Sequence, residues 1–183
     1  FNPRLNEITY LQTAGQENQY ITSVTWDPSC KFIYAGILNR AQNQLLLNKY
    51  DVTTGRFVKT LFEEKNDRYV EPMHGLSFLK NDPSKFVWLS RRDGWNHIYL
   101  YDTEGTLIRQ LTRGEWEVVN LIGFDAQANS VFYESTAESP LETHLYRTEV
   151  KTGKTEKITS GEGVHSIRSS ANLNYFIDIL SSI

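Results

Sequence analysis

Short runs in which apolar and polar residues alternate fill most of the chain, and Gly, Asn, Asp and Pro separate them. Alternation with a period of two is typical of β-strands with one buried face, and helical periodicity is nearly missing. The pattern therefore predicts an all-β protein. The predicted strands are 21–28, 32–38, 44–52 and 57–62, then 75–79, 86–91, 97–102 and 107–111, then 119–124, 131–134, 144–150 and 154–158, and finally 165–170 and 175–180.

The predicted strands fall into groups of four, because one type of turn recurs between the third and fourth strand of each group. A glycine occupies a late position in each of these turns, as Gly55, Gly105 and Gly153. Glycine suits a hairpin position that requires positive φ, which other residues adopt only at a cost. The intervals between the glycines are 50 (105 − 55) and 48 (153 − 105) residues. A period of about 40–50 residues with four strands is typical of β-propeller blades.

We therefore predict a partial β-propeller of about three and a half four-stranded antiparallel blades. The predicted blades are 21–64, 65–113 and 114–160, residues 161–183 supply the first two strands of a further blade, and residues 1–20 are the tail of a preceding blade and its connector. A β-sandwich is the alternative, but a sandwich has no reason to repeat its turn chemistry at this longer period. Complete propellers have roughly 4–8 blades, so we expect the chain to be incomplete at both ends.

Composition narrows the functional classes. The 183 residues are 39% hydrophobic, which suffices for a core, and the net charge of −3 offers no basic excess for a nucleic acid or an anionic membrane surface. Apolar runs are too short for a membrane span. Cys30 is the single cysteine, so we expect no internal disulfide and interpret it as a small core residue. The chain starts at Phe1 without Met or an apolar leader, which favours a processed product or an excised segment.

Several segments then resemble a known family. Residues 86–102 read FVWLSRRDGWNHIYLYD, 114–118 read GEWEV, and 69–74 read YVEPMH, with further matches at 23–26 and 38–43. These segments are similar, in the same order, to the propeller of bacterial dipeptidyl peptidase IV, a prolyl oligopeptidase-type serine peptidase. The resemblance covers about residues 20–180. It implies an eight-bladed propeller followed in the parent protein by an α/β-hydrolase domain.

The resemblance also implies an activity that this chain does not contain. The family releases N-terminal X-Pro and X-Ala dipeptides through a Ser-His-Asp triad in the hydrolase domain. Residues 75–79 begin like the G-x-S-x-G nucleophile elbow but lack its last glycine, so we expect Ser77 to be a strand residue and the chain to have no catalytic residue. The family's paired glutamates, which bind the substrate amino group, belong to an earlier blade. Glu63 and Glu64 come after that place, and we expect them in a solvated loop.

Two candidate binding regions follow. In the resembling enzymes, the connector that enters the blade predicted here at 65–113 lines the outer part of the substrate pocket. The resemblance therefore implies four subsite candidates, Tyr69, Glu71, Pro72 and Met73. A packing role for these residues is equally open. Cations and an aromatic ring in a predicted hairpin turn give a second candidate, a surface site for carbohydrate or peptide. Its residues are Arg92 and Trp95. The alternative is a structural turn in which Asp93 accepts hydrogen bonds and Trp95 covers a strand end.

Histidine spacing indicates no metal site, since none of the four histidines lies two or four residues from another, and we expect no cofactor. We therefore predict a propeller fragment of a dipeptidyl peptidase IV-like exopeptidase that gates the cavity and supports substrate binding. Its expected partners are a peptide substrate, the hydrolase domain and further copies of itself, with no nucleic acid and no membrane span. The family resemblance implies a periplasmic or secreted protein. The alternative function is a free-standing propeller-like module that binds peptide or carbohydrate.

Overall fold

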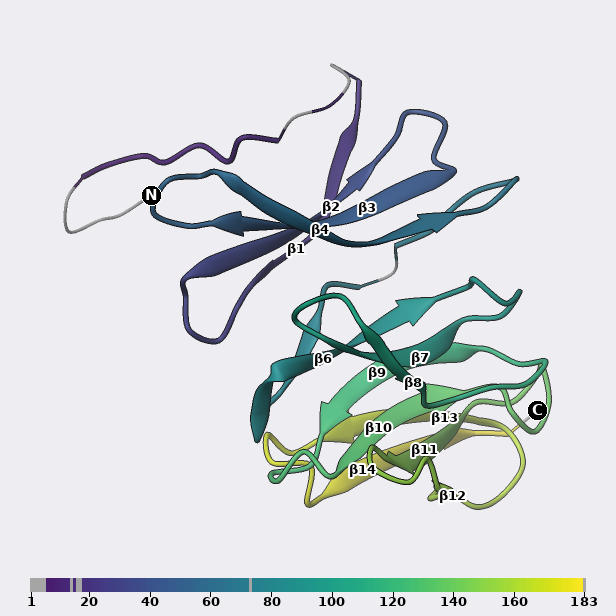
Figure 1. Ribbon diagram of the computed structural model, residues 1–183. Coiled ribbons are helices and arrows are strands. Elements are labelled where there is room, and N and C mark those ends of the chain that lie inside the picture. Colours follow the sequence, from purple (N-terminus) through teal and green to yellow (C-terminus); the bar gives the residue numbers. More distant parts are fainter. Residues whose placement is uncertain (1–5, 14, 16–17, 73, 183) are drawn as a thin grey trace.

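Four antiparallel sheets make up the computed structural model, which describes residues 6–13, 15, 18–72 and 74–182 (Figure 1). The first sheet contains β1 (Tyr20–Trp26), β2 (Phe32–Leu38), β3 (Gln44–Asp51) and β4 (Phe57–Lys65); the second contains β5 (Ser77–Leu79), β6 (Asp82–Ser90), β7 (His97–Asp102) and β8 (Leu107–Gln110). The third contains β9 (Val118–Phe124), β10 (Ser130–Ser135), β11 (His144–Glu149) and β12 (Thr155–Lys157); the last contains β13 (Val164–Ser169) and β14 (Phe176–Ser181). In every sheet the strands follow one another in sequence order.

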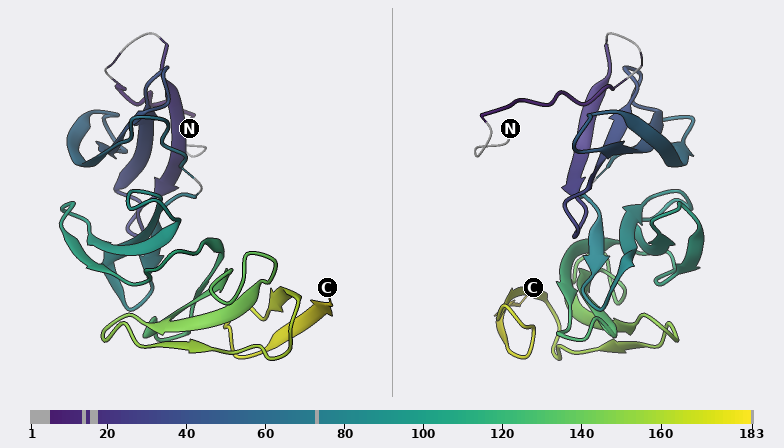
Figure 2. Two further views of the ribbon diagram at one scale, coloured as in Figure 1. Left: turned by 90° about the vertical axis from the view of Figure 1, so that its right-hand side faces the viewer. Right: turned by 60° about the vertical axis from the view of Figure 1, so that its left-hand side comes forward.

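The sheets follow one another along an open arc, from the first sheet to the yellow two-stranded sheet (Figure 2). Sheets that are consecutive in the sequence share buried side chains. The prediction of an all-β partial propeller with three four-stranded blades and half of a fourth is confirmed. Among the described residues there is no helix long and apolar enough to cross a membrane.

The recurring turns have the geometry that their glycines predict. Gly55, Gly105 and Gly153 have φ values of 70°, 93° and 78°, all in the region that residues with a Cβ rarely adopt. At Gly105 there is a second constraint, because a Cβ would lie 2.2 Å from the carbonyl oxygen of Leu61 on β4. This turn of the second sheet therefore meets the backbone of the first sheet closely, which only glycine permits.

The hydrophobic cores lie between sheets. On β6, Phe86 and Trp88 pack in a core shared with the first sheet. Their neighbours Val87 and Leu89 pack in a core shared with the third sheet. Side chains alternate between the two faces of a strand, so one strand supplies two different cores. A third, smaller core joins the third sheet to the two-stranded one.

We call the boundary between two successive sheets a joint. At each joint a buried or half-buried carboxylate of one sheet accepts a hydrogen bond from the other sheet. The pairs are Glu64 Oε1 with Trp88 Nε1 (3.0 Å), Glu117 Oε2 with the Asn96 backbone N (2.7 Å) and Glu134 Oε1 with the Ile167 backbone N (2.9 Å). In each pair the carboxylate accepts the bond. Hydrogen bonds to a charged group are stronger than neutral ones, so each joint has a polar contact that fixes the position of one sheet against the next.

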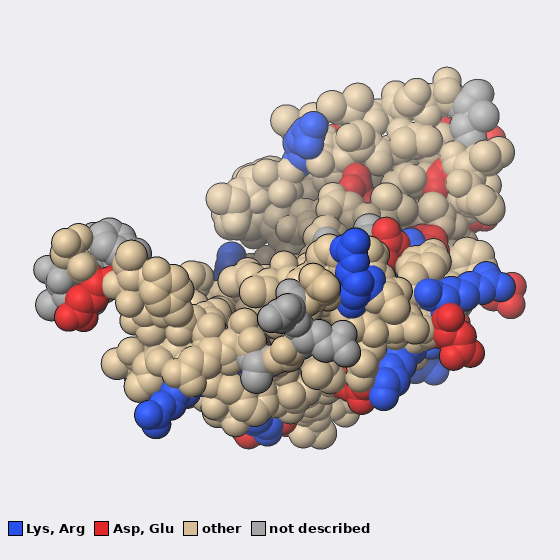
Figure 3. Space-filling model, turned by 90° about the horizontal axis from the view of Figure 1, so that it is seen from above, with Lys and Arg blue, Asp and Glu red and all other residues tan. Residues whose placement is uncertain are grey.

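The outer faces at the two ends of the arc are apolar and are not covered by any described part of the chain. On β1, Ile21, Val24 and Trp26 are exposed, and on β14 the same holds for Ile177 and Ile179. Figure 3, seen from the side of the first sheet, shows a largely uncharged surface with acidic and basic side chains close together along one edge. Several large apolar side chains exposed on one strand are typical of an interaction face.

The structure corrects one expectation and bears out another. Cys30 is not a core residue but is exposed, in the turn between β1 and β2. The Asp27 carboxylate accepts the backbone N–H groups of Lys31 and Phe32 at 2.8 and 2.9 Å, which closes a surface turn around the cysteine. Ser77 is a strand residue as expected, paired with Val87.

The placement of the cores leads to a stability prediction. Leu100 is 4% exposed in the core between the second and third sheets, whereas Leu141 is 70% exposed in a loop. Leu100→Ala should lower the free energy of unfolding by about 2–5 kcal/mol, because it leaves a cavity between two sheets. Leu141→Ala makes the same chemical change on the surface and should leave stability unchanged in urea denaturation. Equal effects would show that the sheets do not share a core.

Candidate binding site at the connector

The connector is the segment 66–76 between β4 and β5. Because β5, β6 and β7 are antiparallel, the connector and the β6–β7 loop (91–96) lie at the same end of the second sheet. The β5–β6 and β7–β8 turns lie at the other end. We call the first of these the connector end.

Contacts at both sides hold the connector against the first sheet. The Val70 backbone N–H donates to the carbonyl of Gln42 at 2.6 Å, and the Val70 side chain is buried in the core between the first two sheets. Further along, the Leu76 backbone N–H donates to Thr25 Oγ1 at 3.1 Å. The β2–β3 loop and β1 of the first sheet therefore fix the connector, whose residues 66–69 and Glu71 are exposed.

Two hollows at the connector end are lined by these exposed residues. The smaller, of about 180 Å³, is lined by Glu63, Glu64, Lys65, Asn66, Tyr69, Val70, Glu71, Arg91 and Arg92. The larger, of about 590 Å³, is lined by Lys65, Asn66, Asp67, Arg68, Tyr69, Arg91 and Gly94. Tyr69 is 55% exposed and borders both hollows, as do Lys65, Asn66 and Arg91.

Glu71 and Arg91 face each other across the smaller hollow. Glu71 Oε2 lies 3.7 Å from Arg91 Nε, and the Glu71 side chain is 53% exposed. Arg91 is held from its other side, where Nη1 donates to Glu117 of the third sheet. An exposed ion pair of this length contributes little to stability. The Glu71 carboxylate is therefore available to another ligand.

Arg92, by contrast, is half-buried, with its side chain 29% exposed and bound by several neighbours. Its Nε donates to Ser90 Oγ at 3.0 Å, its other nitrogens donate to Glu64 and the Tyr101 hydroxyl, and its guanidinium lies 4.3 Å from the centre of the Tyr99 ring. Burial lowers the pKa of Arg92, but Glu64 and Tyr101 beside it outweigh this effect and hold the pKa above its usual value. Arg92 therefore stays charged and connects the first two sheets.

The structure corrects the expectation for Glu64. This residue lies on β4, not in a solvated loop, and its side chain is 10% exposed. It accepts hydrogen bonds from Arg92 and Trp88 of the second sheet. Glu63 also lies on β4 and not in a loop, but it points the other way, is exposed and pairs with Lys65 at 2.7 Å. Alternation along β4 separates the two glutamates to opposite faces.

A third hollow, of about 530 Å³, lies at the opposite end between the second and third sheets. Turns border it, and two of its charged residues, Asp82 and Lys85, pair with each other at 2.7 Å. None of the predicted site residues borders it. The connector end is therefore the better candidate for a binding site.

A family comparison agrees with this fold. The family model described as the dipeptidyl peptidase IV N-terminal region matches residues 2–183. The chain belongs to the dipeptidyl peptidase IV family. Its three blades and the half blade are thus a part of that family's N-terminal propeller region.

Individual relatives are much longer than this chain, which matches only a part of each. The chain is 35% identical over 149 residues to a probable dipeptidyl peptidase 4 of Emericella nidulans, covering 76% of this chain and 19% of the relative. It is 29% identical to the inactive dipeptidyl peptidase 10 of Mus musculus, covering 69% and 17%. The crystal structure of Porphyromonas gingivalis dipeptidyl peptidase 4 superposes with a TM-score of 0.81 at 29% identity, covering 92% of this chain and 24% of that one. The chain thus spans about a fifth of the curated relatives that it matches.

The structure gathers the predicted site residues of this dipeptidyl peptidase IV segment at one end. Tyr69, Glu71 and Pro72 lie in the connector, and Arg92 and Trp95 lie in or next to the β6–β7 loop. Met73 lies outside the described residues. Trp95 is exposed in this loop. Contact of these residues with a substrate or a carbohydrate stays a prediction, and the internal bonds of Arg92 favour a structural role for it.

Sequence reasoning included Arg91 only as a cation of the predicted hairpin turn, and it missed the pairing of Arg91 with Glu117. Both belong to the segments that carry the family resemblance, 86–102 and 114–118, but nothing in either segment alone indicates that they pair across 26 residues. Trp116 is half-buried, packs against the core between the second and third sheets and meets the ring of His97 edge-on at 4.9 Å. One signal could have linked the two residues: Arg91 comes directly after a strand and Glu117 directly before one.

The adjacent glutamates provide a matched test of the Arg92 network. Glu64→Gln should lower the free energy of unfolding by about 1.5–3 kcal/mol, because it removes the charged partner of a half-buried arginine while keeping its shape. Glu63→Gln, one residue earlier, alters only an exposed pair and should unfold like the wild type. Chemical denaturation of the two variants compares them directly. A Glu64→Gln protein as stable as the Glu63→Gln protein would contradict the network.

Proposed function

We propose that this chain is a wall of the substrate chamber in a longer serine-type exopeptidase that releases N-terminal X-Pro and X-Ala dipeptides. In this proposal the propeller gates the chamber by size, since a folded protein cannot enter it, and the chain itself performs no chemistry. The observation that carries the proposal is the pair of hollows at the connector end of a chain that belongs to the dipeptidyl peptidase IV family. Exposed Tyr69 lines both hollows, and exposed Glu71 lines the smaller one. Catalysis belongs to an α/β-hydrolase domain of the longer protein.

The chemistry of the hollows supports a binding role. Tyr69 offers an aromatic face and a hydroxyl group to an extended peptide, and the Glu71 carboxylate accepts hydrogen bonds from backbone N–H groups or from a cationic side chain. Both residues lie on a connector whose flanking contacts are fixed. We infer that they bind the part of a peptide remote from the reacting bond.

The alternative is a propeller that binds peptide without any catalysis. The match to the inactive dipeptidyl peptidase 10 of Mus musculus favours it, because similarity over this region extends to a relative named as inactive. Activity of the longer protein on a chromogenic X-Pro substrate separates the two functions.

The proposal also includes packing against other parts of the longer protein, assembly into a homo-oligomer and a location. The apolar outer faces of β1 and β14 support packing against further parts of the longer protein and its assembly into a homo-oligomer. Family analogy supports a periplasmic or secreted location.

The outer subsite is tested in the longer protein by Glu71→Gln. We expect KM for peptides of several residues to rise about two- to tenfold, because one hydrogen bond to a charged acceptor is lost away from the reacting carbonyl. Both kinetic constants for a short chromogenic substrate should stay unchanged, since that substrate does not reach the subsite. Glu156→Gln, on the outermost strand of the third sheet, is the matched control and should behave as the wild type.

Equal changes for short and long substrates would contradict a subsite and indicate a folding role for the connector. The 183-residue chain alone should release no dipeptide. Activity that follows the purified chain and disappears in Ser77→Ala would overturn the assignment of catalysis to another domain.

A further inference from the structure

A fourth hollow, of about 410 Å³, lies where the last strands of the second and third sheets, β8 and β12, approach each other. It shares no described lining residue with the two hollows at the connector end, so it is not part of the proposed subsite. Its described lining contains two cations, Arg109 and Arg113, and no acidic residue. Each of the other three hollows is lined by at least one acidic residue.

Three donor groups that line this hollow have no acceptor among the described residues. They are the guanidinium groups of Arg109 and Arg113, which are exposed, and the indole N–H of half-buried Trp116. Guanidinium and indole nitrogens donate hydrogen bonds and accept none. None of the described side-chain atoms that are buried without a partner belongs to these residues, so the three donors are open to solvent or to a ligand. A ligand that satisfies them must be rich in acceptors.

Two glycines leave room for such a ligand. The Arg109 guanidinium reaches from β8 to the β11–β12 turn, where a Cβ on Gly153 would lie 3.5 Å from Arg109 Nη1. A Cβ on Gly114 would lie 2.2 Å from Trp116 Nε1. A side chain at position 114 would therefore occupy the space beside the indole N–H, and glycine keeps that space open.

The next sheet shows that a blade does not require these donors. The contact between His97 and Thr112 recurs 47 residues later (144 − 97) between His144 and Thr159. At this interval the residues that correspond to Arg109, Arg113 and Trp116 are Glu156, Ser160 and Gly163. The strand register agrees, because Arg109 is opposite Leu100 and Glu156 is opposite Arg147. The three donors are therefore specific to one joint, which packing of the repeat does not explain.

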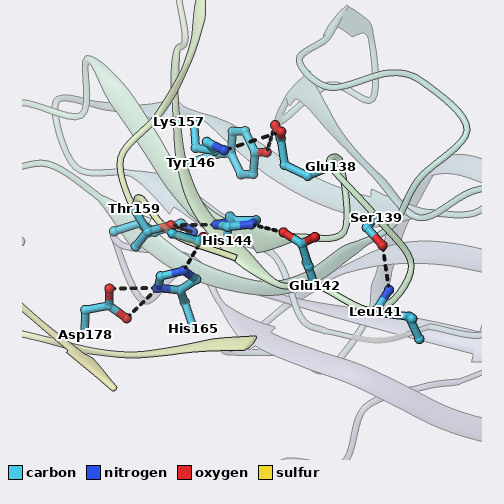
Figure 4. Close-up of polar contacts among 12 residues, drawn as sticks. Glu138, Ser139, Leu141, Glu142, His144, Tyr146, Lys157, Thr159, His165 and Asp178 are labelled. Atoms are coloured by element: carbon cyan, nitrogen blue, oxygen red, sulfur yellow. Dashed lines mark hydrogen bonds and ion pairs between the residues drawn. The ribbon is translucent and has the colours of Figure 1, made fainter. Parts of the chain in front are cut away.

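A neighbouring cation on β12 has the partner that the two arginines lack (Figure 4). Lys157 Nζ lies 3.4 Å from Glu138 Oε2, and the other oxygen of Glu138 accepts the Tyr146 hydroxyl at 2.9 Å. Arg109 and Arg113, by contrast, form no ion pair with a described carboxylate. Two like charges beside one hollow repel each other, and an anion bound between them would remove this cost.

We propose that this hollow binds a small molecule through an oxyanion, a carboxylate or a phosphate, which accepts hydrogen bonds from Arg109, Arg113 and the Trp116 indole. The planar fork of a guanidinium matches the geometry of both anions. The volume lies in the range of about 300–1,000 Å³ that is typical of small-molecule sites. We therefore expect the oxyanion to be carried by a body about the size of a sugar. The proposal does not depend on any peptidase activity.

The first test is a titration of the 183-residue chain, followed by NMR of the tryptophan indole N–H signals. The probes are inorganic phosphate, glucuronate and neutral glucose. At least one of the two anions should shift the Trp116 signal saturably, whereas the signal of Trp88, whose N–H is bound by Glu64, should stay in place. Glucose should shift neither signal. A lower Kd for phosphate indicates a phosphorylated ligand, and a lower Kd for glucuronate indicates a carboxylated one. A Trp116 signal that responds to neither anion overturns the proposal.

The second test measures the Kd of the tighter anion in three arginine variants. Arg109→Ala and Arg113→Ala should each raise Kd about tenfold or more, because a hydrogen-bond donor to a charged group is lost. Arg56→Ala removes an exposed arginine in the β3–β4 turn, makes the same change in net charge and should bind as the wild type. All three side chains are exposed, so the variants should keep the wild-type Tm. An equal loss of affinity in all three variants, or no loss in the first two, refutes the site.

Discussion

Packing of sheet against sheet is the constraint on which this structure depends. A single four-stranded sheet has two faces, and in the second and third sheets both are covered by neighbours. Phe86 and Val87 are adjacent in β6 yet belong to different cores. A shift of one residue in strand register would exchange the two faces, and it would disturb two cores at once. The repeat is therefore stable as an array and not as single sheets, as is general for repeat architectures.

Much of this arrangement could be predicted because its signals are local. Alternation identifies strands, and Gly55, Gly105 and Gly153 mark the turns that need positive φ. Contacts between sheets have no local signal. Glu64 reads as part of a charged loop, since Arg92 and Trp88, which bury it, come 24 to 28 residues later. Cys30 was misplaced for a different reason, because a lone cysteine is usually a core residue, whereas the local turn around Asp27 puts this one on the surface.

The candidate site is a consequence of the same packing. The cores hold the connector and the β6–β7 loop at one end of the second sheet. Most of the charged side chains at this end form ion pairs between sheets. Arg92 is bound by Glu64 and Arg91 by Glu117, so the sequence's two adjacent arginines serve cohesion. Glu71 and Tyr69 are left exposed, which agrees with the sequence-based choice of the connector. The joints also differ chemically from one another, because Trp116 faces His97 at one joint and His165 faces His144 at the next.

The claim that cohesion lies between sheets is tested most directly by native-state hydrogen exchange of the backbone amides. Strands β6, β7, β10 and β11, which have both faces covered, should exchange slowest and with one common free energy of opening. Strands β1 and β14, each with an uncovered face, should exchange faster. Opening of the second and third sheets with separate free energies, each insensitive to destabilisation of the other, would contradict the account.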